Sequence, residues 1–398
     1  MNKMNRVELL APAGNLERLK IALLYGADAV YFGGRNYSLR ANAKNLSIDE
    51  INEACEYAHN LGKKVYVTVN IVFHNEDVIG LVDYLKKLEE CKVDAIIVSD
   101  PLVINIVHDN NINIPIHIST QYSSVNYEVV NFWKSMGVER VVLGRETSKD
   151  EIKEIIDKTG MEIETFVHGA MCASYSGRCV LSNYFTNRDA NRGGCAQICR
   201  WDFDLISDGN KIDNKTKFTM CSKDLCMLKY LPDMIDIGIC SLKVEGRMRS
   251  IYYIATVINT YRRAIDDYYN GVLTEENMNY YINILNRVAN RDSCDQFFNK
   301  FPSVEEQYFL GREEISNQDF LGIVDSYDGE YVSVISKNYF KSGDKVEIIS
   351  PNRDTISFVI PSIYDEEGNM LDASRHPEKI IKFKLDKEVS KFDMMRIA

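Results

Sequence analysis

Residues 64–99 read KVYVTVNIVFHNEDVIGLVDYLKKLEECKVDAIIVS, and this stretch decides the fold class. Two runs rich in Val and Ile, Lys64–Ile71 and Val93–Ser99, flank a segment, Asp77–Cys91, whose apolar residues recur at helical spacing. The two runs lack strict alternation of polar and apolar residues, which is typical of strands covered on both faces. The stretch therefore predicts a strand–helix–strand unit of a parallel sheet.

The same alternation extends in both directions over the N-terminal part of the chain. We expect eight strands, at Val7–Ala11, Ala27–Gly33, Lys64–Ile71, Val93–Ser99, Ile114–Ser119, Val138–Leu143, Met161–Val167 and Ile239–Glu245. Helices are predicted between most of them, including Leu16–Tyr25, Ile48–Leu61, Asp77–Cys91 and Lys149–Lys158. Eight such units favour an α/β fold with a closed (β/α)8 barrel of the TIM type. An open, doubly wound sheet is the alternative.

The seventh and eighth predicted strands are separated by a long, cysteine-bearing insertion at about residues 168–238. We therefore expect a TIM-barrel-like domain over residues 1–290 that carries this insertion, followed by a linker at 291–308. Short strand-like runs such as Tyr331–Ile335 and Ile356–Ile360, separated by turns such as Asp328-Gly329, follow it. They predict a small C-terminal β-barrel over residues 309–398.

The composition is that of a globular protein, since 45% of the 398 residues are hydrophobic and 26% are charged. No apolar run is long enough to span a membrane or to form the core of a signal peptide. We therefore expect a cytoplasmic protein without a membrane partner. The net charge of −11 argues against non-specific coating of nucleic acid, so we expect no DNA partner. A local basic patch on an acidic body is compatible with that charge.

The chain has ten cysteines, and four of them, Cys172, Cys179, Cys195 and Cys199, lie in the insertion. Clustered cysteines in a reducing compartment indicate metal binding or catalysis rather than disulfides. Thiolates are ligands of iron–sulfur clusters and of zinc. Only the Cys195–Cys199 pair has the tight spacing of a zinc knuckle, so the spacing favours a cluster. Three other cysteines compete for a ligand position: Cys221, Cys226 and Cys240. Of these, Cys240, which opens the eighth strand, is the reserve ligand.

Polar residues gather at the predicted carboxyl ends of the strands, where barrels of this type carry their chemistry. The catalytic candidates are His168, Arg145, Glu245, Arg247, Asn70 and Gln121. The substrate-binding candidates are Arg40, Asp100, Glu146, Arg178, Tyr175 and Arg192. Each could instead be a solvated loop residue or part of a salt bridge at the rim.

The candidate residues differ in the chemistry that they suit. His168 could transfer a proton or donate a hydrogen bond to a cluster sulfur. Arg40, Arg145 and Arg247 can bind a carboxylate or a phosphate through a bidentate fork. The insertion combines arginines with aromatic residues, a pattern that suits unpaired nucleotides. Its arginines could equally balance the negative charge of a thiolate cluster.

Six blocks of the sequence resemble the U32 peptidase family, the collagenase-like proteins. They are ELLAPAGN (Glu8–Asn15), ADAVYFGG (Ala27–Gly34), ETFVHGAMCASYSGRCVLS (Glu164–Ser182), ANRGGCAQICRW (Ala190–Trp201), SKDLCMLKYLPDMIDIG (Ser222–Gly238) and SLKVEGRMRS (Ser241–Ser250). Within that family the motifs are most similar to the tRNA hydroxylation protein P group. The resemblance covers essentially the whole chain, including the C-terminal β domain.

The resemblance implies an oxygen-independent enzyme that hydroxylates C5 of the wobble uridine in the anticodon loop of tRNA. It also implies a 4Fe–4S cluster on Cys172, Cys179, Cys195 and Cys199, and prephenate as a co-substrate. The electron donor stays undefined. Members that hydroxylate an rRNA base or the ring of a quinone precursor provide alternative substrates.

The family name implies a peptidase as a further alternative. The sequence contains neither the HExxH motif of zinc proteases nor the GxSxG motif of serine hydrolases. A cysteine protease would need one thiol paired with a histidine, and four clustered cysteines fit that arrangement poorly. A zinc-stapled RNA-binding module without catalysis is the remaining alternative.

Overall fold

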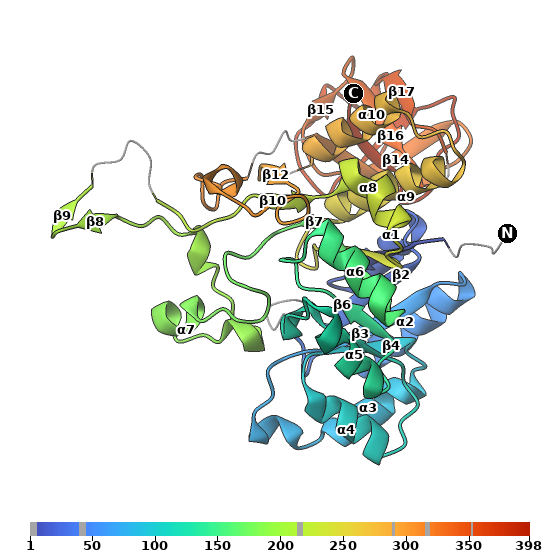
Figure 1. The fold of residues 1–398 in the computed structure, drawn as a ribbon. Coiled ribbons are helices and arrows are strands. Elements are labelled where there is room, and N and C mark those ends of the chain that lie inside the picture. Colours follow the sequence, from blue (N-terminus) through green and yellow to red (C-terminus); the bar gives the residue numbers. More distant parts are fainter. Residues whose placement is uncertain (1–5, 40–44, 213–217, 289–290, 315–318, 352) are drawn as a thin grey trace.

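The structure is a computed structural model that describes residues 6–39, 45–212, 218–288, 291–314, 319–351 and 353–398. Eight parallel strands form its central barrel (Figure 1). They are β1 (Glu8–Pro12), β2 (Ala29–Gly33), β3 (Lys64–Val69), β4 (Ala95–Val98), β5 (Ile116–Ile118), β6 (Arg140–Val142), β7 (Glu162–Gly169) and β11 (Ser241–Val244). Strand β11 pairs with both β1 and β7, so the sheet is closed. The predicted (β/α)8 barrel is confirmed, and the open-sheet alternative is wrong.

Helices cover the outside of the barrel and pack their apolar faces against the strands. They are α1 (Leu16–Leu24), α2 (Ile48–Asn60), α3 (Leu81–Glu90), α4 (Pro101–Asp109), α5 (Tyr127–Ser135), α6 (Lys149–Thr159), α8 (Leu231–Asp236), α9 (Ile251–Tyr269) and α10 (Glu275–Asn286). Ser47 and Ser148 cap α2 and α6 through capping boxes with Glu50 and Glu151. The helix predicted from Asp77 begins only at Leu81, because η1 (Asn75–Val78) precedes it as a separate 3-10 turn.

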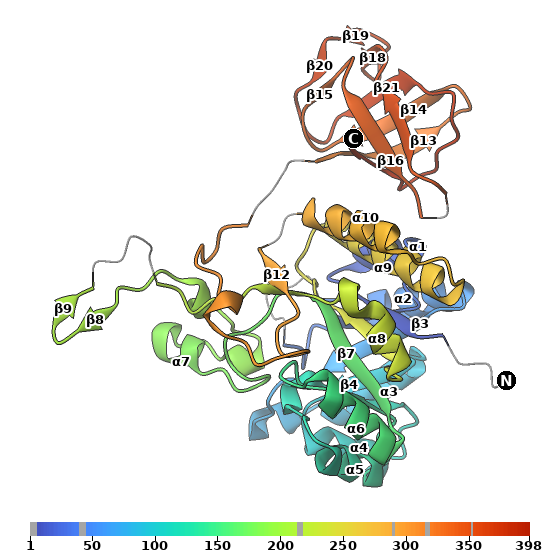
Figure 2. The ribbon, with the colours of Figure 1, turned by 45° about the horizontal axis from the view of Figure 1, so that its top comes forward.

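The insertion leaves the barrel after β7 and returns at β11. It contains α7 (Leu181–Thr186), η3 (Ala190–Arg192), η4 (Ile198–Arg200), a hairpin of β8 (Ile206–Ser207) and β9 (Asn210–Lys211), and β10 (Asp224–Cys226). The hairpin extends away from the body of the molecule (Figures 1 and 2). Strand β10 pairs with the end of β7 and with β12 (Ser293–Cys294). The segment 291–308, which we expected to be a linker, therefore contributes a strand to the barrel sheet.

The C-terminal unit is an antiparallel half-barrel, as the sequence predicted (Figure 2). Its main strands are β13 (Phe320–Tyr327), β14 (Tyr331–Ser336), β16 (Lys345–Ile349), β17 (Ile356–Val359), β18 (Ile363–Tyr364), β19 (Met370–Leu371), β21 (Ile380–Lys384) and β22 (Met394–Ile397). The short strands β15 (Phe340–Lys341) and β20 (Ala373–Ser374) form a second small sheet. A compact apolar core, which includes Val332, Ile348 and Phe383, fills this unit.

The half-barrel docks against helices of the TIM-like barrel. The hydroxyl of Tyr25, in the turn after α1, donates to the carbonyl oxygen of Phe392 at 2.9 Å. The ring of Tyr252 on α9 stacks on Phe320, with centroids 4.7 Å apart. Ile349 and Met394 belong to the same apolar cluster as the barrel helices. The two units therefore share a packed interface.

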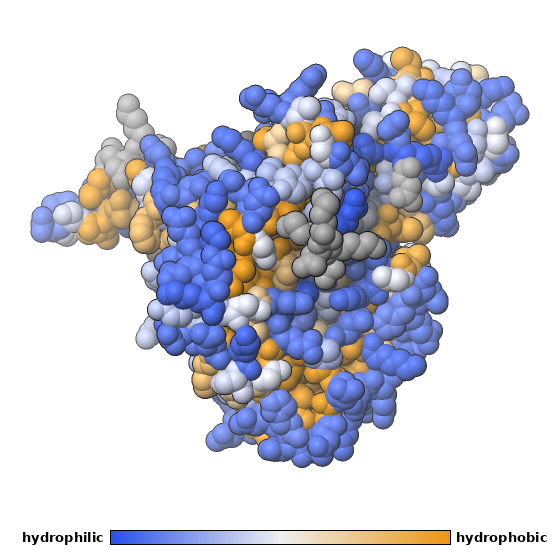
Figure 3. Space-filling view, turned by 45° about the vertical axis from the view of Figure 1, so that its right-hand side comes forward, coloured by the Kyte–Doolittle hydropathy of each residue, from blue (hydrophilic) through white to orange (hydrophobic). Residues whose placement is uncertain are grey.

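Hydrophilic residues cover most of the face shown in Figure 3. Among the residues that the structure describes, no helix is long and apolar enough to cross a membrane.

Candidate functional site

A cavity of about 190 Å³ opens at the carboxyl ends of the barrel strands, between the barrel and the insertion. Eleven of the predicted site residues line it: Asn70, Gln121, Arg145, Glu146, Cys172, Tyr175, Cys179, Cys195, Cys199, Glu245 and Arg247. The structure thus brings together side chains from strand ends and from the insertion that lie far apart in the sequence. We refer to this cavity as the mouth pocket.

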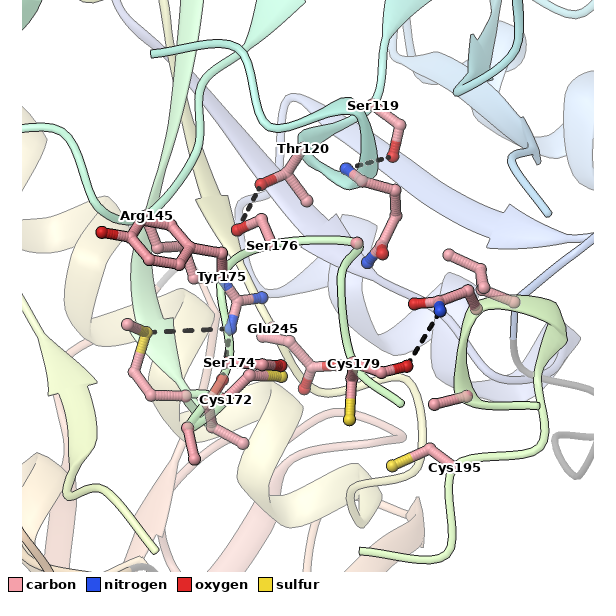
Figure 4. Close-up of a pocket in the computed structure, with 18 of the residues that line it drawn as sticks. Ser119, Thr120, Arg145, Cys172, Ser174, Tyr175, Ser176, Cys179, Cys195 and Glu245 are labelled. Atoms are coloured by element: carbon pink, nitrogen blue, oxygen red, sulfur yellow. Dashed lines mark hydrogen bonds between the residues drawn. The ribbon is translucent and has the colours of Figure 1, made fainter. Parts of the chain in front are cut away.

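The four cysteines of the insertion contribute their thiols to one side of the mouth pocket. Figure 4 shows Cys172, Cys179 and Cys195 with their sulfur atoms directed into the same space. Cys199 lies beside them, and burial raises its pKa to about 11, with the neighbouring thiols of Cys172 and Cys195 adding to the rise. The described residues contain no set of three His, Cys, Asp or Glu side chains close enough to hold a single metal ion.

The loop that carries Cys172 and Cys179 is fixed by contacts with the ends of β5 and β6. Glu146 accepts hydrogen bonds from the backbone N–H of Ser176 at 2.7 Å and from its hydroxyl at 3.0 Å. Gly177 has a φ of +72°, and a Cβ atom there would lie 1.8 Å from the carbonyl oxygen of Gln121. Glu146, which we predicted to bind substrate, therefore holds the insertion against the barrel.

Arg145 lines the mouth pocket next to the segment that carries Cys172 (Figure 4). Its guanidinium lies 3.9 Å from the centre of the Phe166 ring, and its Nη1 donates to the carbonyl oxygen of Ala170. Within the described residues, its Nε and Nη2 atoms have no hydrogen-bond partner. Arg145 thus keeps two donors for an anion.

Arg247 and Asn70 are buried at the same end of the barrel. Arg247 donates from Nη1 to Ser38 at 3.1 Å and from Nη2 to Asn45 at 2.8 Å. The side chain of Asn70 donates to the hydroxyl of Ser119 at 3.2 Å. Both predicted catalytic residues therefore lie in the pocket wall, and each also fixes a loop of the rim.

His168 does not reach the mouth pocket. A β-bulge shifts the pairing of β7 with β11 between Phe166 and His168, and such a shift turns later side chains to the other face. The imidazole packs instead against Tyr253 and Tyr261 of α9, with ring centroids 5.9 and 5.7 Å away. Burial lowers its pKa to about 3. The catalytic role that we predicted for His168 has no geometric support.

Arg192 fastens the insertion to the loop between β3 and α3. It pairs with Asp77, donates to the carbonyl oxygen of Val72 at 2.8 Å, and lies 3.6 Å from Glu76. These contacts engage its guanidinium, and Arg192 does not line the mouth pocket. Arg192, which we predicted to bind substrate, therefore holds the insertion against the loop between β3 and α3.

Four other predicted residues lie elsewhere or outside the described chain. Asp100 caps α4 by accepting from the backbone N–H of Leu102 at 2.9 Å. Arg178 is exposed outside the pocket lining. Cys240 precedes β11 at the opposite end of the barrel, where its thiol contacts the carbonyl oxygen of Ile163 at 3.1 Å, so the geometry does not support a reserve ligand there. Arg40 falls outside the described residues.

Sequence reasoning missed a network of buried charges inside the barrel. Lys243 contacts Glu164 at 2.7 Å, and Arg140 contacts Glu164 at 3.3 Å and Glu8 at 2.6 Å. The side chains of Lys243 and Glu164 are 4% and 0% exposed, and Lys243 also lines the floor of the mouth pocket. The sequence did contain an indication of this network, because all four charged residues lie within predicted strands. The strand residues that fill a barrel interior are usually branched and apolar.

Comparisons with known proteins agree over nearly the whole chain. Residues 14–308 match the sequence model of peptidase family U32, and residues 316–396 match the model of the U32 C-terminal domain. The tRNA hydroxylation protein P1 of Bacillus subtilis is 50% identical over 401 residues, which covers 98% of this chain and 94% of that protein. The tRNA hydroxylation protein P of Escherichia coli is 34% identical, over 92% of this chain and 91% of its own. A 23S rRNA 5-hydroxycytidine synthase of Escherichia coli is 36% identical, over 66% of this chain and 40% of that protein.

Proposed function

Because this chain belongs to peptidase family U32, we propose that it is an iron–sulfur-dependent, oxygen-independent RNA hydroxylase that acts on C5 of the wobble uridine of tRNA. Relatives named for tRNA hydroxylation match it over more than nine-tenths of its length, and a relative named for rRNA 5-hydroxycytidine synthesis matches about two thirds of it. The observation that carries the proposal is the convergence of four cysteines on a pocket at the barrel mouth.

The donor set fits an iron–sulfur cluster better than zinc. A single zinc ion binds each thiolate sulfur at a Zn–S distance of about 2.3 Å, so the sulfurs would lie in van der Waals contact with one another. No set of three such ligands stands that close in the described residues, although four thiols share one pocket. In a 4Fe–4S cluster each thiolate binds a different iron atom, so the sulfurs stand farther apart. When bound, the cluster would supply electron transfer or activation of an oxygen donor.

The pocket wall suits a small anionic co-substrate such as prephenate. Arg145 lines the cavity, its Nε and Nη2 have no hydrogen-bond partner within the described residues, and an arginine fork is the natural partner of a carboxylate. Arg247 and Glu245 lie on the same wall and would position the bound molecule. Our proposal assigns Arg145 to anion binding, and Arg247 and Glu245 to the positioning of the bound molecule.

The insertion suits the unpaired nucleotides of an anticodon loop. Tyr175, Tyr184 and Phe185 are 63%, 84% and 54% exposed, and aromatic side chains with this exposure can stack on bases. A base must leave its stack to reach a pocket at a barrel mouth, and a loop base does so at low cost. The exposed Arg178 would contact phosphate.

The test compares tRNA from strains that differ only in this protein. Digested tRNA from a deletion strain should lack 5-hydroxyuridine-derived nucleosides by mass spectrometry, and the wild-type gene should restore them. Cys195→Ser should fail to restore them and should lose iron and visible absorbance after anaerobic purification. Cys294→Ser is the matched control, because Cys294 lies in β12 outside the pocket lining, and it should restore them. Full nucleoside content in the deletion strain would overturn the proposal.

The peptidase alternative finds no support in the geometry of the site. A thiol protease needs a cysteine within hydrogen-bond reach of a histidine. No histidine is among the described residues that line the mouth pocket, and His168 packs against α9.

A further inference from the structure

The buried Lys243 differs from an ordinary interior lysine because it is one of the residues that line the mouth pocket. Within the described residues, its Nζ has one hydrogen-bond acceptor, Glu164, at 2.7 Å. The rings of Tyr31 and Phe166 lie 4.3 and 5.6 Å away. An ammonium has three donors, so Lys243 retains hydrogen atoms that point away from its carboxylate.

Burial has the largest influence on the pKa of Lys243 and lowers it. The negative charge of Glu164 opposes that shift, and the positive charge of Arg140 adds to it. Glu164 is shared, since Arg140 approaches its other oxygen at 3.3 Å. A desolvated lysine beside a second cation is the arrangement that activates lysine as a nucleophile toward carbonyl groups.

The same pocket offers a site for a carboxylate within reach of that lysine. The Arg145 guanidinium lies 3.9 Å and the Lys243 ammonium 5.6 Å from the centre of the Phe166 ring, so both cations lie near the same aromatic side chain. The cavity of about 190 Å³ admits a small organic acid. A carboxylate bound to Arg145 would present an adjacent carbonyl carbon toward Lys243.

We propose that Lys243 captures a small 2-oxo acid as an imine, with the carboxylate of that acid bound by Arg145 and with Glu164 as the proton shuttle. This inference rests on the interior of the barrel and requires neither the cluster nor RNA. It assigns the pocket floor a covalent binding function beyond the hydroxylation proposed above.

The proposed step balances without an oxidant or a reductant. Glu164 takes one proton from the ammonium, and the free amine attacks the carbonyl carbon to form a C–N bond. A second proton moves from nitrogen to the former carbonyl oxygen, and Glu164 returns the first proton to that oxygen. The C–O bond then breaks and water leaves. The protonated imine retains the third hydrogen and the single positive charge.

Reductive trapping tests the proposal on the full-length wild-type protein. The protein is incubated with pyruvate and sodium cyanoborohydride and is then digested for peptide mapping. We expect one dominant adduct, on the peptide that contains Lys243, with a mass gain equal to pyruvic acid less one oxygen atom. No adduct, or adducts spread over exposed lysines, would overturn the proposal. This mapping needs no variant, so a folding defect cannot obscure it.

Two variants sharpen the assignment. Lys243→Arg retains the charge but cannot form the imine and should give no adduct at this site, whereas Lys153→Arg, at an exposed lysine of α6, should trap like wild type. Trapping by Lys243→Arg at the wild-type level would overturn the proposal.

A further pair of probes tests the role of Arg145. Arg145→Gln should raise the half-saturating pyruvate concentration about tenfold, the factor expected when one hydrogen bond between charged groups is lost. Trapping of acetone, which lacks the carboxylate, should not change. Unchanged pyruvate saturation would overturn the assignment of the carboxylate to Arg145.

Discussion

Both β-structures of this chain bury charged side chains, but the parallel barrel buries the larger network, whereas the half-barrel pairs the buried Arg396 with Glu347 at 2.8 Å. The interior of the parallel barrel contains the buried network of Glu8, Arg140, Glu164 and Lys243. The core of the C-terminal half-barrel is a cluster of Leu, Val, Ile, Phe and Met side chains. Buried ion pairs usually add little stability compared with apolar residues of the same volume. The parallel barrel therefore contains a buried charge network that adds little to its stability. The core of the half-barrel is stabilised mainly by apolar packing.

The largest expected effect comes from breaking the ion network in the parallel barrel. Lys243→Met leaves Glu164 with Arg140 as its remaining cation, and removing one partner of a buried pair costs about 3–5 kcal/mol. The measurement is urea unfolding followed by the fluorescence of Trp133, which is fully buried in the barrel domain, in a Trp201→Phe background. These are the two tryptophans of the chain.

The double variant Lys243→Met/Glu164→Leu is the control for that experiment. Replacing both charges with apolar residues should recover more than half of the lost stability, because neither partner is left unpaired. A single variant that loses less than about 1 kcal/mol would contradict our view of the barrel interior.

The next effect is a pH dependence that originates in two buried histidines of the parallel barrel. Burial lowers the pKa values of His117 and His168 to about 3, from 6.5 in an unfolded chain. Between these values the unfolded state binds a proton that the folded state does not, so stability falls as pH falls. From pH 7 to pH 5 each histidine should cost about 2 kcal/mol. Urea midpoints of Trp133 fluorescence at the two pH values measure this loss.

His168→Phe tests that origin, because phenylalanine can replace the imidazole against Tyr253 and Tyr261. The variant should lose about half of the pH dependence. Hydrogen exchange of Val332 and Val334 amides in the half-barrel should change little, since the cluster of buried residues around them is apolar. An unchanged pH dependence in His168→Phe would show that other groups control it.

The smallest effect concerns the half-barrel. Ile348→Val removes one buried methylene from its core and should cost about 1 kcal/mol. Hydrogen exchange of β16 and β22 measures that loss, while tRNA hydroxylation in a complemented strain should be unchanged. Val359→Ala, at a position that is 60% exposed, is the control and should cost less than about 0.5 kcal/mol. A loss of hydroxylation in Ile348→Val would contradict the division of roles between the two units.

Much of the fold could be predicted because its signals are local. The strand predicted at Val93–Ser99 contains the observed β4, and the helices predicted to begin at Ile48 and Lys149 begin there, capped by the preceding Ser47 and Ser148. Side-chain periodicity and capping depend on residues a few positions apart, so they can be recognised in a single sequence. The carboxyl ends of parallel strands share one edge of the barrel, and that rule placed Asn70 and Arg145 correctly in the pocket wall.

The remaining features depend on contacts between residues that are distant in the sequence. A single bulge turned His168 from the pocket to α9, and Arg192 is engaged by Asp77, which lies on another loop. The burial of Lys243 with Glu164 follows from the closure of β11 on β7.

The sequence by itself determined the eight strand–helix units, the cysteine-bearing insertion and the antiparallel C-terminal unit. Only the tertiary structure decided which charged side chains face the mouth pocket, which hold the insertion in place and which are buried inside the barrel. The physical reason is that periodicity fixes the type of an element, whereas the face that each side chain takes depends on register and on partners supplied by distant strands.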